Sequence, residues 1–183
     1  MMMAMNQEKH IERPFNGTLF SVEVATWSDE QGRPVRREMV RHPGAVMIVP
    51  QLDDGRLVLI RNYRIAPDQR LWEFPAGKLE PGEAPLVTAQ RELAEETGYQ
   101  ALQWDGLGTF YTSPGFADEL MHVFLARGLT AGSTALEPGE DIEVMVLRRD
   151  EIDQLLSQGQ VQDAKTLAGL LFLQRFESME PSP

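Results

Sequence analysis

Residues Gly77–Tyr99 read GKLEPGEAPLVTAQRELAEETGY, and the rest of the chain is organised around this stretch. Its first part contains two glycines and a proline, which predicts a loop up to Glu83. The residues after the loop predict a helix, because Leu86, Ala89 and Leu93 fall on one side of a helix that turns about 100° per residue. The stretch therefore combines a loop with a helix that has one apolar side.

The same helix carries a cluster of acidic residues away from its apolar side. Glu92, Glu95 and Glu96 gather there, since residues three and four apart are neighbours on a helix surface. Carboxylates this close repel one another, so helix stability does not explain them. A solvated acidic face is the simplest explanation. Bound Mg²⁺ or Mn²⁺ would offset the repulsion, because hard cations prefer oxygen ligands.

The stretch also resembles a known motif, the Nudix box. That motif is a glycine, five residues, a glutamate, seven residues, and then Arg-Glu-apolar-x-Glu-Glu-x-Gly-apolar. The chain supplies every fixed position, namely Gly77, Glu83, Arg91, Glu92, Leu93, Glu95, Glu96, Gly98 and Tyr99. So many positions in a fixed register favour the motif over a plain acidic face. We expect the two glycines to supply backbone conformations that side chains resist.

The resemblance implies an α+β fold, an α/β/α sandwich in which a mixed β-sheet lies between helices. It also implies that the box binds divalent metal, Mg²⁺ or Mn²⁺, with more than one ion. Glu92 and Glu96 would be the main metal ligands and Glu95 the third. Glu83 would lie close to the metal, and the backbone carbonyl of Ala76 would be a further ligand.

By the same resemblance, the expected catalytic residues are Arg91, Glu95 and Glu140. Arg91 would brace the box together with the glutamate of its loop. Glu140 lies in the acidic loop before the segment IEVMVL, and it best matches a glutamate that binds metal or acts as base on the nucleophilic water. Glu137 and Asp141 are alternatives, and a mobile solvated loop is the simpler explanation.

Segments outside the box resemble the ADP-ribose pyrophosphatase branch of the family. They are RNYRIAPDQRLWEFPAGKLEPGE before the box, DAKTLAGLL near the end, and YTSPGFADELMHVFLA, in which Pro114 lies 15 positions after Tyr99. The resemblance implies hydrolysis of ADP-ribose to AMP and ribose 5-phosphate, with Pro114 and Gly115 among the substrate-binding residues. A simple turn at residues 113–115 is the alternative.

Three residues before the box complete the expected substrate site. In this branch an arginine at the position of Arg64 contacts the diphosphate, and a guanidinium suits bidentate phosphate binding. Arg61 is a weaker candidate, and an ordinary surface salt bridge is the alternative for both arginines. Glu73 would support the site, although an exposed strand residue would need no function.

Two other functions remain open from the sequence. The same catalytic core would act on another nucleoside diphosphate derivative, such as a nucleotide sugar or a dinucleotide. The domain would otherwise be a nucleotide-binding sensor without turnover, although a complete box argues against a sensor.

The composition limits the partners of the protein. The net charge of −11 disfavours a nucleic-acid or anionic-membrane surface but allows a phosphorylated small molecule, because bound cations reverse the local field. No apolar run approaches the roughly 20 residues that span a bilayer, and we find no secretory signal pattern. The chain contains no cysteine, so it forms no disulfide. These features predict a cytoplasmic protein.

The pattern of strands and turns divides the chain after residue 43. Residues 1–43 would contain a loose tail and an antiparallel β-hairpin with strands at 18–27 and 35–41. Because a two-stranded unit is marginal alone, and because members of the branch pair through this region, we expect a homodimer. Residues 44–183 would form the catalytic domain.

The expected strands of that domain are 45–50, 57–63, 71–74, 102–111, 120–126 and 142–147. Two further helices are expected beyond the box. The first covers 150–158 with Asp150 as its N-cap. The second covers 164–176, where apolar residues occupy much of the circumference and predict a buried helix.

Overall fold

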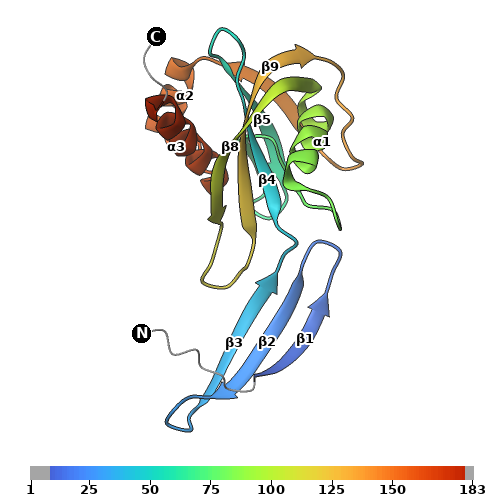
Figure 1. The fold of residues 1–183 in the computed structure, drawn as a ribbon, viewed down its shortest axis with the longest axis vertical. Coiled ribbons are helices and arrows are strands. Elements are labelled where there is room, and N and C mark those ends of the chain that lie inside the picture. The colour runs from blue at the N-terminus through green and yellow to red at the C-terminus, as the bar shows by residue number, and fades with distance from the viewer. Residues whose placement is uncertain (1–8, 180–183) are drawn as a thin grey trace. The chain divides into compact units, whose positions relative to one another are not determined.

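The structure, a computed structural model, describes residues 9–179 (Figure 1). These residues form two compact units. The first comprises the residues up to Pro43 together with Tyr111–Leu120, and the second comprises Gly44–Phe110 and the residues from Met121 onward. The sequence assigned Tyr111–Leu120 to the second domain, whereas the structure assigns it to the first unit. The expected tail at residues 1–5 lies outside the described residues.

The first unit is built on a three-stranded antiparallel sheet. Its strands are β1 (His10–Asn16), β2 (Ser21–Ser28) and β3 (Pro34–Arg41), in that order. β2 and β3 form the expected antiparallel hairpin, and β1 adds a third strand that the sequence did not predict. β1 lacks a periodic pattern because all its residues are exposed and its register shifts between Glu12 and Phe15, around Pro14. An edge strand tolerates such a proline.

A charge network joins the segment Tyr111–Leu120 to this sheet. Arg41 of β3 donates hydrogen bonds to Glu23 of β2 at 2.7 Å and to Asp118 at 2.9 Å. Arg13 of β1 also donates to Glu23, at 2.7 Å. Hydrogen bonds from these two arginines hold the pKa of the Glu23 carboxyl below its usual range. The contacts explain why this segment belongs to the first unit.

The second unit contains two sheets. The four-stranded sheet consists, in spatial order, of β7 (Ala76–Lys78), β4 (Ala45–Pro50), β9 (Leu120–Ala131) and β8 (Tyr99–Tyr111). The three-stranded sheet consists, in spatial order, of β10 (Ile142–Leu147), β5 (Leu57–Arg64) and β6 (Gln69–Glu73). β4 runs parallel to β9 and antiparallel to β7, so the larger sheet is mixed, as expected.

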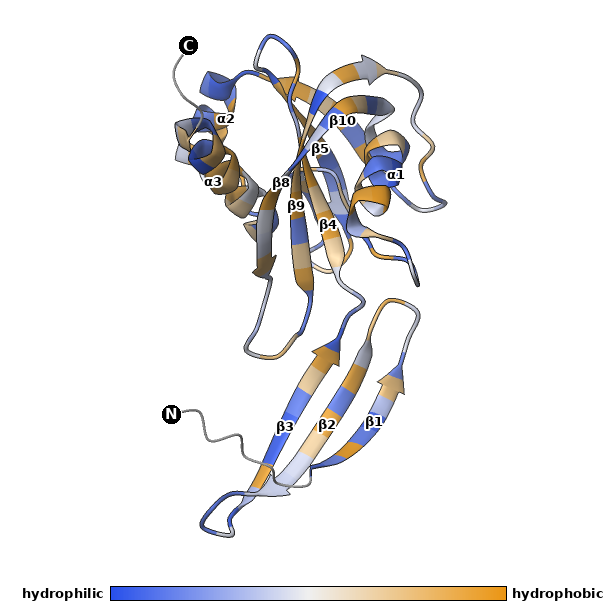
Figure 2. Cartoon of the chain, viewed as in Figure 1, coloured by the Kyte–Doolittle hydropathy of each residue, from blue (hydrophilic) through white to orange (hydrophobic). Residues whose placement is uncertain are grey.

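Three helices cover the sheets: α1 (Pro85–Thr97), α2 (Arg149–Ser157) and α3 (Ala164–Met179). Figure 1 shows α1 on one side of β4, and α2 and α3 on the other. β4 is buried along its whole length and mostly hydrophobic in Figure 2, as a strand covered on both faces requires. The expected α/β/α sandwich is confirmed. None of the helices within residues 9–179 is long and apolar enough to cross a membrane.

Alternate residues of β4 belong to two hydrophobic cores. The core under α2 and α3 contains Met47, Val49, Ile152 and Leu173. The core under α1 contains Val46, Ile48, Ala89 and Leu93. These eight side chains are at most 1% exposed. Because the apolar side of α1 is fixed on the sheet, its acidic side is also held in a defined place.

Two helices differ from the sequence prediction. α2 has Arg148 as its N-cap, so Asp150 lies within the first turn and its expected N-cap role is wrong. The carboxylate of Glu151 accepts the backbone N–H of Arg148 at 2.8 Å, which stabilises this start of the helix. α3 is buried on one face only, since Leu173 is fully buried but Leu171 is 66% exposed. The expectation of a buried α3 is therefore too broad.

Candidate active site

Helix α1 starts with Pro85 and ends at Gly98, which has a φ of 74°. The N–H of Gly98 donates to the carbonyl of Ala94 at 2.9 Å and caps the helix. A Cβ at Gly98 would lie 2.7 Å from the carbonyl oxygen of Gly132. Gly98 therefore has the left-handed backbone expected from the sequence, and it also allows a close approach of the chain.

Gly77 has a different role from the one expected. It is not among the described glycines with positive φ, so its backbone conformation does not require glycine. A Cβ at Gly77 would instead lie 1.9 Å from both Cδ and Oε1 of Glu92. Glycine is needed here because it leaves space for the Glu92 carboxylate.

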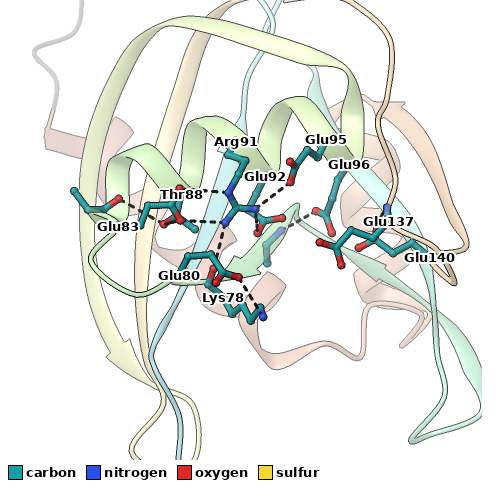
Figure 3. A network of polar contacts seen from close by, with 12 residues as sticks. Lys78, Glu80, Glu83, Thr88, Arg91, Glu92, Glu95, Glu96, Glu137 and Glu140 are labelled. Atoms are coloured by element: carbon teal, nitrogen blue, oxygen red, sulfur yellow. Dashed lines mark hydrogen bonds and ion pairs between the residues drawn. The ribbon is translucent and has the colours of Figure 1, made fainter. Parts of the chain in front are cut away.

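Arg91 binds three carboxylates of the box (Figure 3). Its guanidinium donates to Glu92 at 2.7 Å, to Glu95 at 3.0 Å and to Glu83 at 3.2 Å. Hydrogen bonds from Arg91, and then from Thr88, hold the pKa of Glu83 below its usual range. The guanidinium of Arg91 thus joins the glutamate of the loop to two glutamates of the helix.

Glu96 is almost completely buried, with 4% of its surface exposed. Its Oε2 accepts the backbone N–H of Ala76 at 2.9 Å. Burial raises the pKa of Glu96 to about 8, and the charge of Glu92 adds to the shift. The side chain of Glu92 is only 12% exposed, and burial raises its pKa too. A solvated acidic face therefore does not describe Glu92 or Glu96.

These buried carboxylates fit a divalent cation. Glu92 and Glu96 offer oxygen ligands, and ionisation of both is opposed by burial unless a positive charge lies nearby. The missing side chain of Gly77 makes room for the carboxylate of Glu92 itself. Within residues 9–179, no group of three or more histidine or acidic side chains is already arranged as a set of metal ligands. Two of the acids, Glu92 and Glu95, are hydrogen-bonded to Arg91 in this structure.

Glu140 lies in the loop between β9 and β10, near the box helix (Figure 3). Its charge contributes to the raised pKa of both buried glutamates of α1, so the loop acts electrostatically on the box. Its Oε2 accepts the backbone N–H of Glu137 at 2.7 Å. Asp141, an alternative base, is ion-paired with Arg70. Glu140 is therefore a better candidate than Asp141.

Arg64 at the end of β5 forms a bidentate pair with Glu73 at the end of β6. Its Nε donates to Oε1 at 2.8 Å and its Nη2 donates to Oε2 at 2.6 Å. Glu73 is fully buried, so the alternative explanation, an exposed strand residue without a function, does not apply. Hydrogen bonding to Glu73 raises the pKa of Arg64, and the charge of Glu96 adds to the shift. Arg64 therefore lies within the electrostatic reach of the box.

Arg61 has a different environment. Its guanidinium carbon lies 5.0 Å from the ring centre of Trp72, its cross-strand neighbour on β6. Its Nε is buried, and no described residue accepts a hydrogen bond from it. The contact with Trp72 gives the guanidinium of Arg61 a partner within the protein. The expected role of Arg61 in substrate binding remains a prediction.

Comparison with known proteins agrees with this geometry. Residues 41–170 match the family model described as NUDIX domain. The chain belongs to the Nudix family. It is 40% identical over 178 residues to the ADP-ribose pyrophosphatase of Bacillus subtilis, covering 95% of this chain and 96% of that protein. It is 39% identical to the methanol dehydrogenase activator of Bacillus methanolicus, with the same coverage. A crystal structure titled ADP compounds hydrolase has a TM-score of 0.80 at 26% identity, covering 96% of both chains.

The residues expected from the Nudix branch after the box, Pro114 and Gly115, belong to the first unit. The backbone N–H groups of Phe116 and Ala117 donate to the carbonyl of Ser113 at 3.1 and 2.9 Å. The segment therefore forms a turn, which was the alternative explanation for it. A role of Pro114 and Gly115 in binding substrate remains a prediction.

Two polar residues near the Nudix site were not predicted, Asp163 and Lys165. Nζ of Lys165 lies 2.5 Å from Oδ1 of Asp163 and 3.9 Å from Oε2 of Glu73. The segment DAKTLAGLL was used only as a branch resemblance and as a helix. The sequence did contain a signal for a helix N-cap at Asp163, because this aspartate lies directly before the helix and three positions before Thr166.

Proposed function

We propose that this Nudix hydrolase splits ADP-ribose into AMP and ribose 5-phosphate. Water attacks a phosphorus of the diphosphate, and the bond from that phosphorus to the bridging oxygen breaks. The observation that carries the proposal is the assembled box, in which Arg91 joins Glu83, Glu92 and Glu95 beside the buried Glu96. The names of two proteins compared above refer to ADP-ribose or ADP compounds, which supports this substrate class.

The box would hold more than one divalent cation, Mg²⁺ or Mn²⁺. Glu92, Glu96 and the carbonyl of Ala76 are the proposed ligands, with Glu95 and Glu83 as further candidates. A bound cation neutralises the diphosphate and lowers the pKa of water. The chain itself supplies carboxylates that burial and mutual repulsion leave poorly stabilised without a cation, since the pKa values of Glu92 and Glu96 are raised.

Arg64 and Glu140 would complete the reacting site. The guanidinium of Arg64 has five N–H groups and donates two of them to Glu73. Its other N–H groups, which no other described residue accepts, suit the oxygens of a diphosphate. Glu140 would accept the proton of the attacking water. Only its Oε2 accepts a hydrogen bond from a described residue, and its charge is close enough to the box to raise the pKa of Glu96.

Another nucleoside diphosphate derivative is the second candidate, because nucleotide sugars and dinucleotides present the same diphosphate. The test is a panel of ADP-ribose, a nucleotide sugar and a dinucleotide, each with Mg²⁺ or with excess chelator. We expect the highest kcat/KM on ADP-ribose, and we expect no hydrolysis of any substrate in excess chelator. A higher kcat/KM on another substrate would reject ADP-ribose, and full activity in chelator would reject the metal. Tight binding without turnover would indicate a sensor.

We also propose a cytoplasmic homodimer that forms through the first unit. Strand β1 is an exposed edge, and the apolar side chains of Ile11, Phe15 and Phe20 are between 38% and 50% exposed. A second copy would cover these groups. The mass of the native protein in solution tests the dimer, and a monomer mass would reject it.

A further inference from the structure

The start of α3 forms a polar cluster against the end of β6. Asp163, directly before α3, is 8% exposed, and its Oδ2 accepts the backbone N–H of Thr166 at 2.9 Å and the Thr166 hydroxyl at 2.8 Å. Thr166 is fully buried, and its Oγ1 accepts the backbone N–H of Phe74 at 2.9 Å. The cap of α3 therefore also fixes the backbone directly after Glu73.

Lys165 connects this cluster to the carboxylate of Glu73. Its Nζ lies 2.5 Å from Oδ1 of Asp163 and 3.9 Å from Oε2 of Glu73. The same Oε2 accepts the hydrogen bond from Nη2 of Arg64 at 2.6 Å. The buried carboxylate of Glu73 is therefore shared between two cations, one from β5 and one from α3.

The charged side chains of the cluster balance, because it contains two cations and two anions. They are Arg64, Lys165, Glu73 and Asp163. Removing the charge of Lys165 would leave Asp163 and Glu73 with Arg64 alone, and a buried anion without a full partner is costly. Arg64 would then be held more strongly by Glu73.

The place of α3 is fixed by close packing. A Cβ at Gly169 would lie 2.8 Å from Cε of Met47 and 2.9 Å from Cδ2 of Phe74. The helix therefore has little freedom to shift relative to the strands that it covers. This rigidity allows the first turn of α3 to define where Glu73 lies.

We propose that Asp163 and Lys165 are positioning residues for Arg64. Through Glu73, they hold the guanidinium so that its remaining N–H groups meet the diphosphate of the substrate. The inference rests on the proposed function in one respect, namely that the ligand is a nucleoside diphosphate. It makes the first turn of α3 a part of substrate recognition, although α3 contributes no residue to the box.

A double-mutant cycle tests the inference in the full-length protein. Lys165→Met is compared with the parent in two backgrounds, one with Arg64 and one with Arg64→Gln. Two quantities are measured, KM for ADP-ribose and the dissociation constant of ADP with Mg²⁺ by calorimetry. We expect Lys165→Met to raise both about tenfold, equivalent to about 1.4 kcal/mol, with kcat within about twofold. In the Arg64→Gln background the same change should leave KM and the dissociation constant almost unaltered, because Lys165 acts on the substrate only by positioning Arg64.

Three variants serve as controls. Lys165→Arg keeps the positive charge and should restore most of the ADP affinity. Arg149→Met removes a cation that pairs with Glu177 at 2.6 Å elsewhere in the second unit, and should leave ADP affinity unchanged. Asp163→Asn is a second way to disturb the cluster, and should weaken ADP binding in the same direction as Lys165→Met.

Equal effects of Lys165→Met in both backgrounds would overturn the inference, because Lys165 would then act without Arg64. A lower melting temperature of Lys165→Met with unchanged ADP affinity would overturn it too, since it would indicate a merely structural role. If the parent binds ADP but does not hydrolyse ADP-ribose, the proposed function fails while the ADP measurements still decide the inference. A parent that does not bind ADP would overturn both.

Discussion

A residue of the box can matter because its small size leaves space for a neighbouring side chain. Gly77 shows this most directly, since any side chain there would collide with the carboxylate of Glu92. The motif alone suggested an unusual backbone, because a sequence does not reveal which atoms approach a glycine. The approach arises only when β7 and α1 pack together.

We predict that Gly77→Ala removes most activity. The added methyl group would displace the Glu92 carboxylate, and a misplacement of about 1 Å costs roughly 100-fold in rate. The matched control is Gly106→Ala, because a Cβ at Gly106 meets no atom within 4 Å. Steady-state kinetics with ADP-ribose and Mg²⁺ measure both variants. Equal activity of the two variants would contradict this role of Gly77.

We predict that the stability of the metal-free protein depends on the ionisation of Glu96. Its pKa is about 8 in the folded protein against an ordinary value of 4.5, so the folded state binds the proton more tightly. This contribution to stability is present below the lower pKa and is lost as the pH rises through the higher one. The melting temperature in chelator should fall between about pH 5 and about pH 9. Glu96→Gln should show a smaller fall, and an equal fall would contradict the assignment.

At the scale of elements, strands buried on both faces were predictable because they are continuous apolar runs between turns. The bounds of β4, which is buried along its whole length, match the sequence prediction for this reason. β1 and β7 were not predicted, since one is an exposed edge with a proline and the other has three residues. The contact of Thr166 with Phe74, directly after β6, also escaped prediction, because these two residues are 92 positions apart.

We predict that Arg91 holds the loop and the helix of the box together. Arg91→Met would leave Glu83, Glu92 and Glu95 without their shared cation, and should lower the free energy of unfolding by about 1–3 kcal/mol. Mg²⁺ should restore part of this loss, because a bound cation also offsets the repulsion. Urea unfolding with and without Mg²⁺ provides the measurement. Arg148→Met, at an exposed surface pair, should change little, and a similar loss there would argue against a special role for Arg91.

We predict that the loop between β9 and β10 supplies the base. Glu140→Gln should reduce kcat by about 100-fold or more, because general base catalysis contributes about that much. The dissociation constant of ADP should stay nearly unchanged. Glu137→Gln is the neighbouring control and should retain most activity, since it is the backbone of Glu137 that contacts Glu140. Normal turnover of Glu140→Gln would move the base to another residue.

At the scale of the whole molecule, the box predicted the family and the sandwich because its positions have a fixed register in sequence. The organisation into units was harder to predict. Tyr111–Leu120 connects β8 and β9 of the second unit in sequence. It is nevertheless bound to the N-terminal sheet, through the hydrogen bond between Arg41 and Asp118. A pairing of residues 77 positions apart leaves no local pattern in the sequence.

The central claim is that this box hydrolyses the diphosphate of ADP-ribose. The most direct test is ³¹P NMR of ADP-ribose incubated with the protein and Mg²⁺, beside Glu96→Gln and the exposed-strand control Glu143→Gln. We predict that the parent and Glu143→Gln form AMP and ribose 5-phosphate and that Glu96→Gln forms almost none. Unchanged ADP-ribose with the parent, or equal product from Glu96→Gln, would contradict the claim.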